Sequence, residues 1–308
     1  MSQPTTQQPL TFHQIHIDAA RNATDDFNLF HDPRKWARIR GNPFGGPIVL
    51  GFQLESLVED QIRLNREQTG EAALIETHGL RYSNYQFTFA SVVKPGETVQ
   101  VEIKKSQFKA GENTTLGNRV AVKGDRGIVI FGFKKESQAP LFLADTDLSF
   151  LPDLTHQPDR SYINGTALFY KRKFMSTGHA KNFLSGSLAD QSAYFDELAD
   201  RVRFPETYPS GLISCALLER ARKNGHDFEN EPMIYTSHCI SIDRELTKSL
   251  RSNDVLNLLV GEPALTAEKD DGGITQVLHH CFGVLQTGAV LFRAAITMMP
   301  LAAILRAT

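Results

Sequence analysis

The chain has 308 residues, of which 41% are hydrophobic and 22% charged, the balance of an ordinary globular protein with room for two domains. Its 33 basic and 35 acidic residues leave a formal net charge of −2, so no excess of positive charge favours nucleic acid or an anionic membrane as a partner. The three cysteines are scattered, the start of the chain lacks an apolar signal sequence, and no apolar run reaches about 18 residues, so we expect reduced cysteines, no membrane partner and a cytoplasmic location.

The first half of the sequence predicts helices followed by short strands. Residues 17–30 are amphipathic, and a turn rich in glycine and proline at 41–47 leads into residues 48–65, where apolar side chains recur at helical spacing. The pattern then changes to runs typical of β-strands, at residues 73–75, 81–89, 98–103, 118–122 and 127–133. A long helix followed by antiparallel strands predicts an α+β fold in which the sheet wraps the helix.

The second half repeats this order. A helix that ends near Phe183 and a second helix over 212–222 precede further runs typical of strands, at residues 234–242, 255–260 and 288–297. Matching segments keep nearly the same offset along the chain: Pro47 with Pro209, residues 94–99 with 251–256, and the apolar runs that begin at Gly127 and Gly288. Several anchors at one offset indicate a duplication.

The boundary between the halves is marked by composition. Residues 151–165 carry two prolines and few apolar side chains, as expected of a linker. We therefore predict an N-terminal domain over 1–150, a linker over 151–165 and a C-terminal domain over 166–308, which together form a pseudo-dimer within one chain.

One short stretch before the long predicted helix carries groups suited to proton transfer. Asp26, Asn28 and His31 follow one another at spacings of two and three residues. Taken alone, this pattern also fits a helix end capped by Asn28 and His31, with Asp26 on the solvated face. The alternative is chemical, because a histidine can accept and donate protons near neutral pH while a nearby carboxylate orients the water that it serves.

This motif, followed by Gly46-Pro-Ile-Val-Leu-Gly51 at the start of the next helix, resembles the MaoC-like (R)-specific enoyl-thioester hydratases. That family has Asp-x-Asn-Pro-x-His and then Pro-Ile-Val-His-Gly, and its later Pro-Gly-Asp-Thr turn is matched here by Pro-Gly-Glu-Thr98. The chain departs from the pattern at Leu29 and Leu50, which stand where the family has proline and histidine. With the repeat, the resemblance covers about the whole chain and implies a double hot-dog fold: two antiparallel sheets, each wrapping a long central helix, that form one pseudo-dimer.

The resemblance also implies a reaction and a role for each residue. A hydro-lyase of this kind hydrates trans-2-enoyl thioesters and, in reverse, dehydrates (R)-3-hydroxyacyl thioesters. Asp26 and His31 would hold one water, Asn28 would orient it, and the backbone N–H of Gly51 would receive the thioester oxygen at the positive end of the helix. We expect no metal and no separate cofactor, because the acyl group arrives as a thioester of coenzyme A (CoA) or of an acyl carrier protein.

A basic cluster follows the motif directly and comprises Arg34, Lys35, Arg38 and Arg40. Such a cluster is commonly a solvated face, and it also suits contact with the phosphates of CoA or of a phosphopantetheine arm.

The second half lacks the motif's functional groups. Its segment 184–192 resembles the family's Leu-Ser-Gly-Asp-x-Asn-x-x-His, but it has Ser187, Ala189 and Ser192 where the family has aspartate, asparagine and histidine. We therefore expect one working site, in the N-terminal half.

Two other functions stay open at this point. Hot-dog domains also host acyl-CoA thioesterases, and a chain that kept the fold but lost turnover would bind acyl thioesters without reaction. A double hot-dog chain can be complete as a monomer, and it can also pair as a homodimer.

Overall fold

The computed structural model describes residues 9–265 and 276–307 and shows an N-terminal half in which helices precede strands. Its helices are α1 (Gln14–Thr24), α2 (Gly51–Thr69) and α3 (Ala72–Thr77), with short 3-10 turns η1 (Leu29–His31) and η2 (Trp36–Arg38). Its strands are β1 (Leu10–Thr11), β2 (Tyr82–Phe89), β3 (Thr98–Ile103), β4 (Gln107–Lys109), β5 (Thr115–Gly124) and β6 (Gly127–Ser137).

The C-terminal half repeats this order of elements. Its helices are α4 (Thr177–Gly186), α5 (Thr207–Gly211), α6 (Ile213–Lys223), α7 (Arg244–Ser249) and α8 (Leu301–Ala307), with 3-10 turns η3 (Gln191–Ala193) and η4 (Glu197–Ala199). Its strands are β7 (Ser161–Tyr162), β8 (Phe169–Phe174), β9 (Phe195–Asp196), β10 (Arg201–Val202), β11 (Met233–Asp243), β12 (Val255–Val260), β13 (Ala264–Leu265), β14 (Val277–Leu285) and β15 (Val290–Pro300).

The two halves share one continuous antiparallel sheet. Its strand order is β1-β3-β5-β6-β2-β11-β15-β14-β12-β8-β7, and the halves meet where β2 pairs with β11, for example at Gln86 opposite Cys239. This corrects the expectation of two separate sheets. Each half would otherwise present an open strand edge at this point, and pairing the two edges satisfies their backbone N–H and C=O groups.

Two further predictions from the sequence are wrong in detail. Residues 73–75 belong to the helix α3 and not to a strand, because a three-residue apolar run does not distinguish the two by its periodicity. The first helix ends at Thr24 and not near residue 30, because Asp25 takes a left-handed conformation with φ 52°. That early end places the residues after Asp25 in a loop, where their side chains can turn toward α2.

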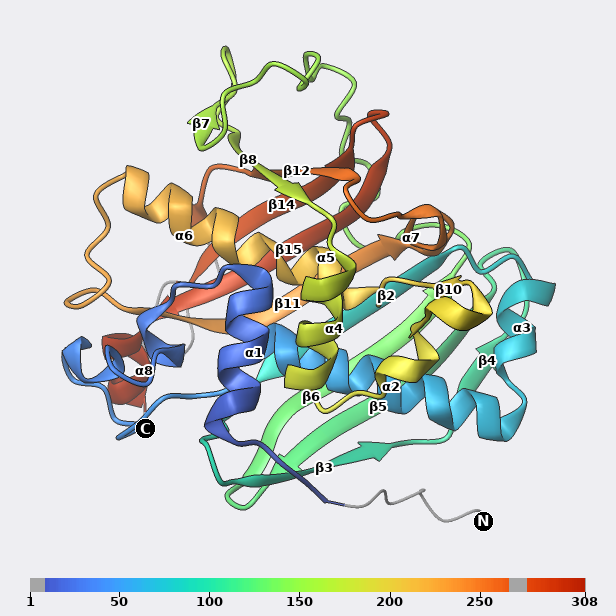
Figure 1. The fold of residues 1–308 in the computed structure, drawn as a ribbon, viewed down its shortest axis with the longest axis horizontal. Helices are drawn as coiled ribbons and strands as arrows, with labels where there is room; N and C mark the ends of the chain where they lie inside the picture. Colours follow the sequence, from blue (N-terminus) through green and yellow to red (C-terminus); the bar gives the residue numbers. More distant parts are fainter. Residues whose placement is uncertain (1–8, 266–275, 308) are drawn as a thin grey trace.

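The helices lie together on one face of the sheet (Figure 1). The equivalent helices α1 and α4 cross closely at Gly186, where a Cβ atom would lie 2.6 Å from the carbonyl oxygen of His16. The long helix α2 is enclosed along most of its length, so that even its acidic residues Glu55 and Glu59 are buried. His238 Nδ1 lies 2.8 Å from the Glu55 carboxylate, and Glu59 accepts hydrogen bonds from Thr207 of the other half.

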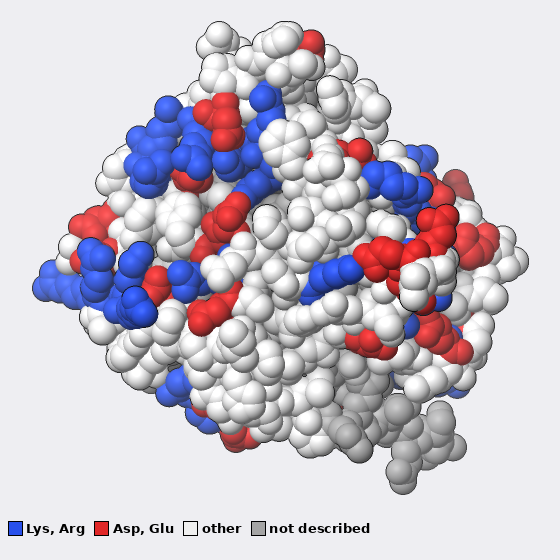
Figure 2. Space-filling model, in the orientation of Figure 1, with Lys and Arg blue, Asp and Glu red and all other residues white. Residues whose placement is uncertain are grey.

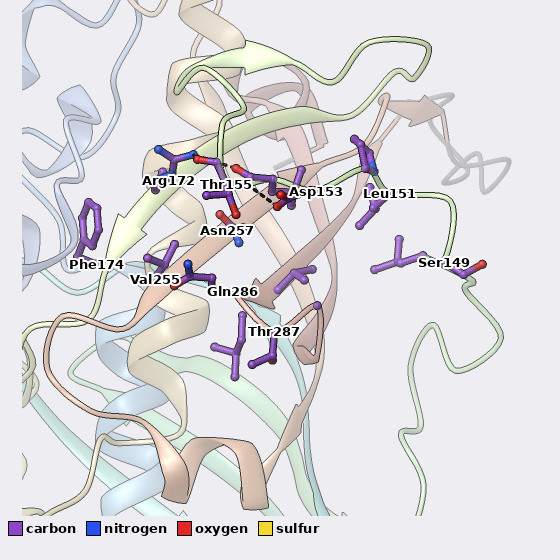
Figure 3. A pocket seen from close by; sticks show the side chains of 16 residues that line it. Ser149, Leu151, Asp153, Thr155, Arg172, Phe174, Val255, Asn257, Gln286 and Thr287 are labelled. Atoms are coloured by element: carbon purple, nitrogen blue, oxygen red, sulfur yellow. Dashed lines mark hydrogen bonds between the residues drawn. The ribbon is translucent and has the colours of Figure 1, made fainter.

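The segment predicted as a linker lies against the outer face of the C-terminal part of the sheet. Leu154 and Ile163 pack there with residues of β8, β12 and β14, and the Arg172 guanidinium donates to the carbonyl oxygens of Leu154 and Thr155, each at 2.9 Å. A cavity of about 500 Å³ remains beneath residues 148–155, bounded by Arg172 and Asn257 (Figure 3). The segment is therefore a strap fixed to the sheet.

No helix within the described part of the chain is both long enough and apolar enough to cross a membrane.

Candidate active site

The carboxylate of Asp26 is held between the two halves. Asp26 follows the left-handed residue at the end of α1 and is only 4% exposed. Its Oδ1 accepts the backbone N–H of Asn28 at 2.8 Å, and its Oδ2 accepts the hydroxyl of Ser214 at 2.5 Å. Ser214 belongs to α6 of the C-terminal half, so both halves fix the orientation of this carboxylate.

His31 ends the short turn η1 and has one ring nitrogen committed to the backbone. Its Nδ1–H donates to the carbonyl oxygen of Ile48 at 2.8 Å, which leaves Nε2 as the nitrogen with a free lone pair. Burial lowers the pKa of His31, and the negative charge of Asp26 opposes part of that shift. The imidazole is therefore uncharged at neutral pH, which is the state that a general base requires.

Gly51 is the first residue of α2, so its N–H has no acceptor within the helix. The residues just before it have partners, since Val49 N–H donates to Val93 and Leu50 N–H donates to the side chain of Gln53. The ring of Phe89 lies so close that a Cβ atom on Gly51 would be 2.9 Å from its Cε1 atom. A larger residue here would require the Phe89 ring or the start of α2 to move.

These groups meet at a cavity of about 260 Å³. Asn28, His31 and Gly51 line it, whereas Asp26 is not a lining residue and contacts the cavity wall through the backbone N–H of Asn28. The other walls are mostly apolar and include Phe30, Val49, Leu54, Phe89 and Ile234. A larger cavity of about 740 Å³ adjoins it, and the two share Asn28, Phe30, Met233 and Tyr235.

Ser214 and Tyr235 also belong to this site, although sequence reasoning did not predict them. The Tyr235 hydroxyl lies 3.1 Å from Ser214 Oγ, which continues the hydrogen-bonded chain from Asp26. Burial and the charge of Asp26 raise the pKa of Tyr235, so its hydroxyl stays protonated. Ser214 lies 188 positions after Asp26 and Tyr235 lies 21 positions after Ser214, and no local pattern indicates either residue.

The second half has the same backbone geometry without the same chemistry. Leu188, like Asp25, takes a left-handed conformation after a helix, with φ 58°. The N–H of the next residue, Ala189 or Asp26, then donates to the carbonyl oxygen five positions earlier. The structure therefore matches Asp26 with Ala189 and not with Ser187.

The following turns correspond in the same way. Asn28 and Asp190 each accept a backbone N–H at the start of a three-residue 3-10 turn, and these turns end at His31 and Ala193. This match places Asp190 and Ala193 where the sequence pattern predicted Ala189 and Ser192. The difference arises because the loop after α4 is one residue shorter than the loop after α1.

The basic cluster Arg34, Lys35, Arg38 and Arg40 lies on the surface near the site. Its side chains are exposed, and none of them is a described lining residue of either cavity. Arg38 forms an ion pair with Glu229, and Lys35 lies 3.8 Å from Asp32. Positive side chains also gather over the end of α6 and the neighbouring loops (Figure 2).

Replacing Arg21 with glutamine should raise the pKa of His31. The Arg21 cation is one of the groups that lower this pKa, so removing it favours the protonated imidazole. The expected result is a His31 titration midpoint at higher pH, measured by NMR with His31→Ala to assign the signal. Lys35→Gln is the matched control, because Lys35 faces the same Asp32 carboxylate as Arg21. An unchanged midpoint, or one at lower pH, contradicts the electrostatic account of this site.

Sequence comparison alone finds no relatives, since no family profile and no curated protein matches the chain. Solved structures do match. A protein described as a MaoC domain dehydratase from Chloroflexus aurantiacus has a TM-score of 0.61 and 11% identity, over 97% of this chain and 95% of that one. A MaoC-like dehydratase has a TM-score of 0.58 and 11% identity, over 96% and 97% of the two chains.

A third structure describes the tandem architecture. A conserved protein of Mycobacterium tuberculosis with a double hot-dog fold has a TM-score of 0.57 and 13% identity, over 97% of this chain and 96% of that one. At these identities the likeness concerns the fold. The chain therefore has the double hot-dog fold in its tandem form, the fold found in MaoC-like dehydratases.

Proposed function

We propose that this chain hydrates trans-2-enoyl thioesters reversibly, and that the N-terminal half, residues 1–150, carries the catalytic motif. The observation that carries the proposal is the state of His31: buried, uncharged at neutral pH, tied to Ile48 through Nδ1, and lining a cavity with Gly51. A base with a free Nε2 beside a helix N-terminus suits the addition of water to an activated double bond.

The proposed reaction consumes one water and needs no oxidant or reductant. The water oxygen bonds to C3 of the enoyl group while His31 Nε2 takes one water proton, and that proton then passes to C2. Asp26 has further lone pairs besides those used by Ser214 and Asn28, so it can accept the second water proton as a hydrogen bond. In the reverse direction the same groups remove water from a 3-hydroxyacyl thioester.

Negative charge gathers on the thioester oxygen during this step. The N–H of Gly51, at the positive end of α2, is the donor proposed to stabilise it. The exposed cluster Arg34, Lys35, Arg38 and Arg40 is proposed to contact phosphates of the CoA or phosphopantetheine carrier. No separate cofactor takes part in the proposed reaction.

The test is to follow hydration of crotonyl-CoA and of longer trans-2-enoyl-CoA substrates by the loss of enoyl absorbance, with the product identified by its mass. Free CoA is measured in the same samples. Formation of 3-hydroxyacyl-CoA without release of CoA supports the proposal. Release of CoA without hydration would mean a thioesterase, and binding without turnover, on CoA and carrier-protein substrates alike, would mean a binding protein.

A further inference from the structure

The larger of the two adjoining cavities contains a cation that has no counterion among the described residues. Arg220 of α6 lines this cavity of about 740 Å³. Its guanidinium has no ion pair or hydrogen bond within residues 9–265 and 276–307, and its Nε atom is buried. Arg220 as a whole is half-buried, so its guanidinium is open to a ligand in the cavity, and negative charge supplied there would be stabilised by an ion pair partly screened from water.

A second polar side chain of this cavity has one ring nitrogen without a partner. His279 of β14 is 7% exposed, and its Nδ1 has no hydrogen-bond partner in the described structure. Burial and the Arg220 cation lower the pKa of His279 to about 4, so the imidazole is uncharged at neutral pH and its single N–H can donate to the carbonyl oxygen of Gly261. The rest of the lining is largely apolar, with Leu217, Phe228 and Met298 among its members.

Arg220 lies on the same helix as Ser214, a residue of the proposed active site. Ser214, which contacts Asp26, and Arg220 lie six residues apart on α6, a rise of about 9 Å. The equivalent position on α2, also seven residues after the start of the helix, is the buried apolar residue Val58. Packing in the helix layer therefore does not require an arginine at this place.

We propose that this cavity receives an acyl group that ends in a carboxylate, which Arg220 binds. The inference rests on the proposed function, because it assumes that the reacting carbons lie beside His31. A planar carboxylate matches the fork of a guanidinium, and its single charge matches one cation beside a neutral imidazole. A phosphate carries about −1.5 to −2 charge and is better matched by the four exposed cations at residues 34–40.

The experiment compares trans-2-octenedioyl-CoA with trans-2-octenoyl-CoA, which differ only at the far end of the acyl chain. Wild type should prefer the dicarboxylic substrate. In Arg220→Gln, kcat/KM for that substrate should fall about 10- to 100-fold, the size expected for a hydrogen bond between charged groups, while the value for octenoyl-CoA changes little. Arg222→Gln is the matched control, since Arg222 lies on the same helix and pairs with Glu219 at 3.0 Å.

Two results would overturn the proposal. An equal fall on both substrates would mean that Arg220 contacts the carrier's phosphates, and no change on either would mean that it contacts no ligand. If wild type hydrates neither substrate, the proposed function fails separately. The subsite is then tested by calorimetric binding of octanedioyl-CoA and octanoyl-CoA, which cannot be hydrated. Equal affinities in wild type and Arg220→Gln would reject it.

Discussion

His31→Ala should lower kcat/KM for enoyl-CoA hydration by about 10²- to 10⁴-fold, the range that general acid–base catalysis contributes. The variant removes the only group in the proposed step that both takes and returns a proton. Asp26→Asn should cause a loss of similar order, because an amide cannot replace the carboxylate as an acceptor for both Ser214 and the water. Initial rates on crotonyl-CoA, with thermal unfolding to confirm a folded protein, measure both effects.

The internal repeat supplies the control for these variants. Asp190 occupies in the second half the turn position that Asn28 occupies in the first, and it is exposed. Asp190→Asn should therefore leave kcat/KM unchanged. Folded His31→Ala and Asp26→Asn proteins that keep wild-type rates would remove the motif from the reaction, whatever the chain's activity proves to be.

Gly51→Ala keeps the backbone N–H but should displace it, so kcat should fall by at most about 10²- to 10³-fold, the loss seen when one oxyanion donor is removed. The added methyl group would meet the Phe89 ring at 2.9 and 3.0 Å, so the start of α2 or the ring must move. Overpacking of this kind also destabilises a protein by about 1–3 kcal/mol. Stopped-flow hydration and chemical unfolding measure the two losses.

A second substitution separates the steric cause from other effects of alanine. Phe89→Leu makes room beside residue 51, so the double variant should regain part of the lost stability. Gly46→Ala is the control in the same glycine-rich segment, because nothing lies within 4 Å of its Cβ position. A Gly51→Ala protein as active and as stable as Gly46→Ala would contradict the tight contact between residue 51 and the Phe89 ring.

Local patterns in the sequence correctly predicted those helices and strands whose structure depends mainly on their own residues. The strands Thr98–Ile103 and Val255–Val260 have the predicted bounds, because short apolar runs between turns leave little ambiguity. The long helix was also placed correctly to within four residues. The Asp26–His31 motif could be recognised because its three polar residues lie close together in the sequence.

What the sequence could not predict depends on contacts between the halves. Glu55 and Glu59 lie between the apolar positions of the helical pattern, as solvent-facing residues would. In the structure they are instead in contact with His238 and Thr207 of the other half. The hydroxyl of Ser214 reaches Asp26 only because α6 lies beside the end of α1. Such pairs carry no local signal, since nothing near either residue in the chain indicates its partner.

The shared sheet has a consequence for how the two halves can change. In a symmetric dimer of identical chains, every substitution appears in both subunits at once. Here the pairing of β2 with β11 joins two halves that are encoded by different parts of one gene. A residue can therefore change in one half while its counterpart in the other half stays the same. Arg220 on one helix and Val58 on the other show such a difference at equivalent positions. Joining the halves in one chain thus lets a residue of one half change while the residue at the matching position of the other half keeps its role in packing.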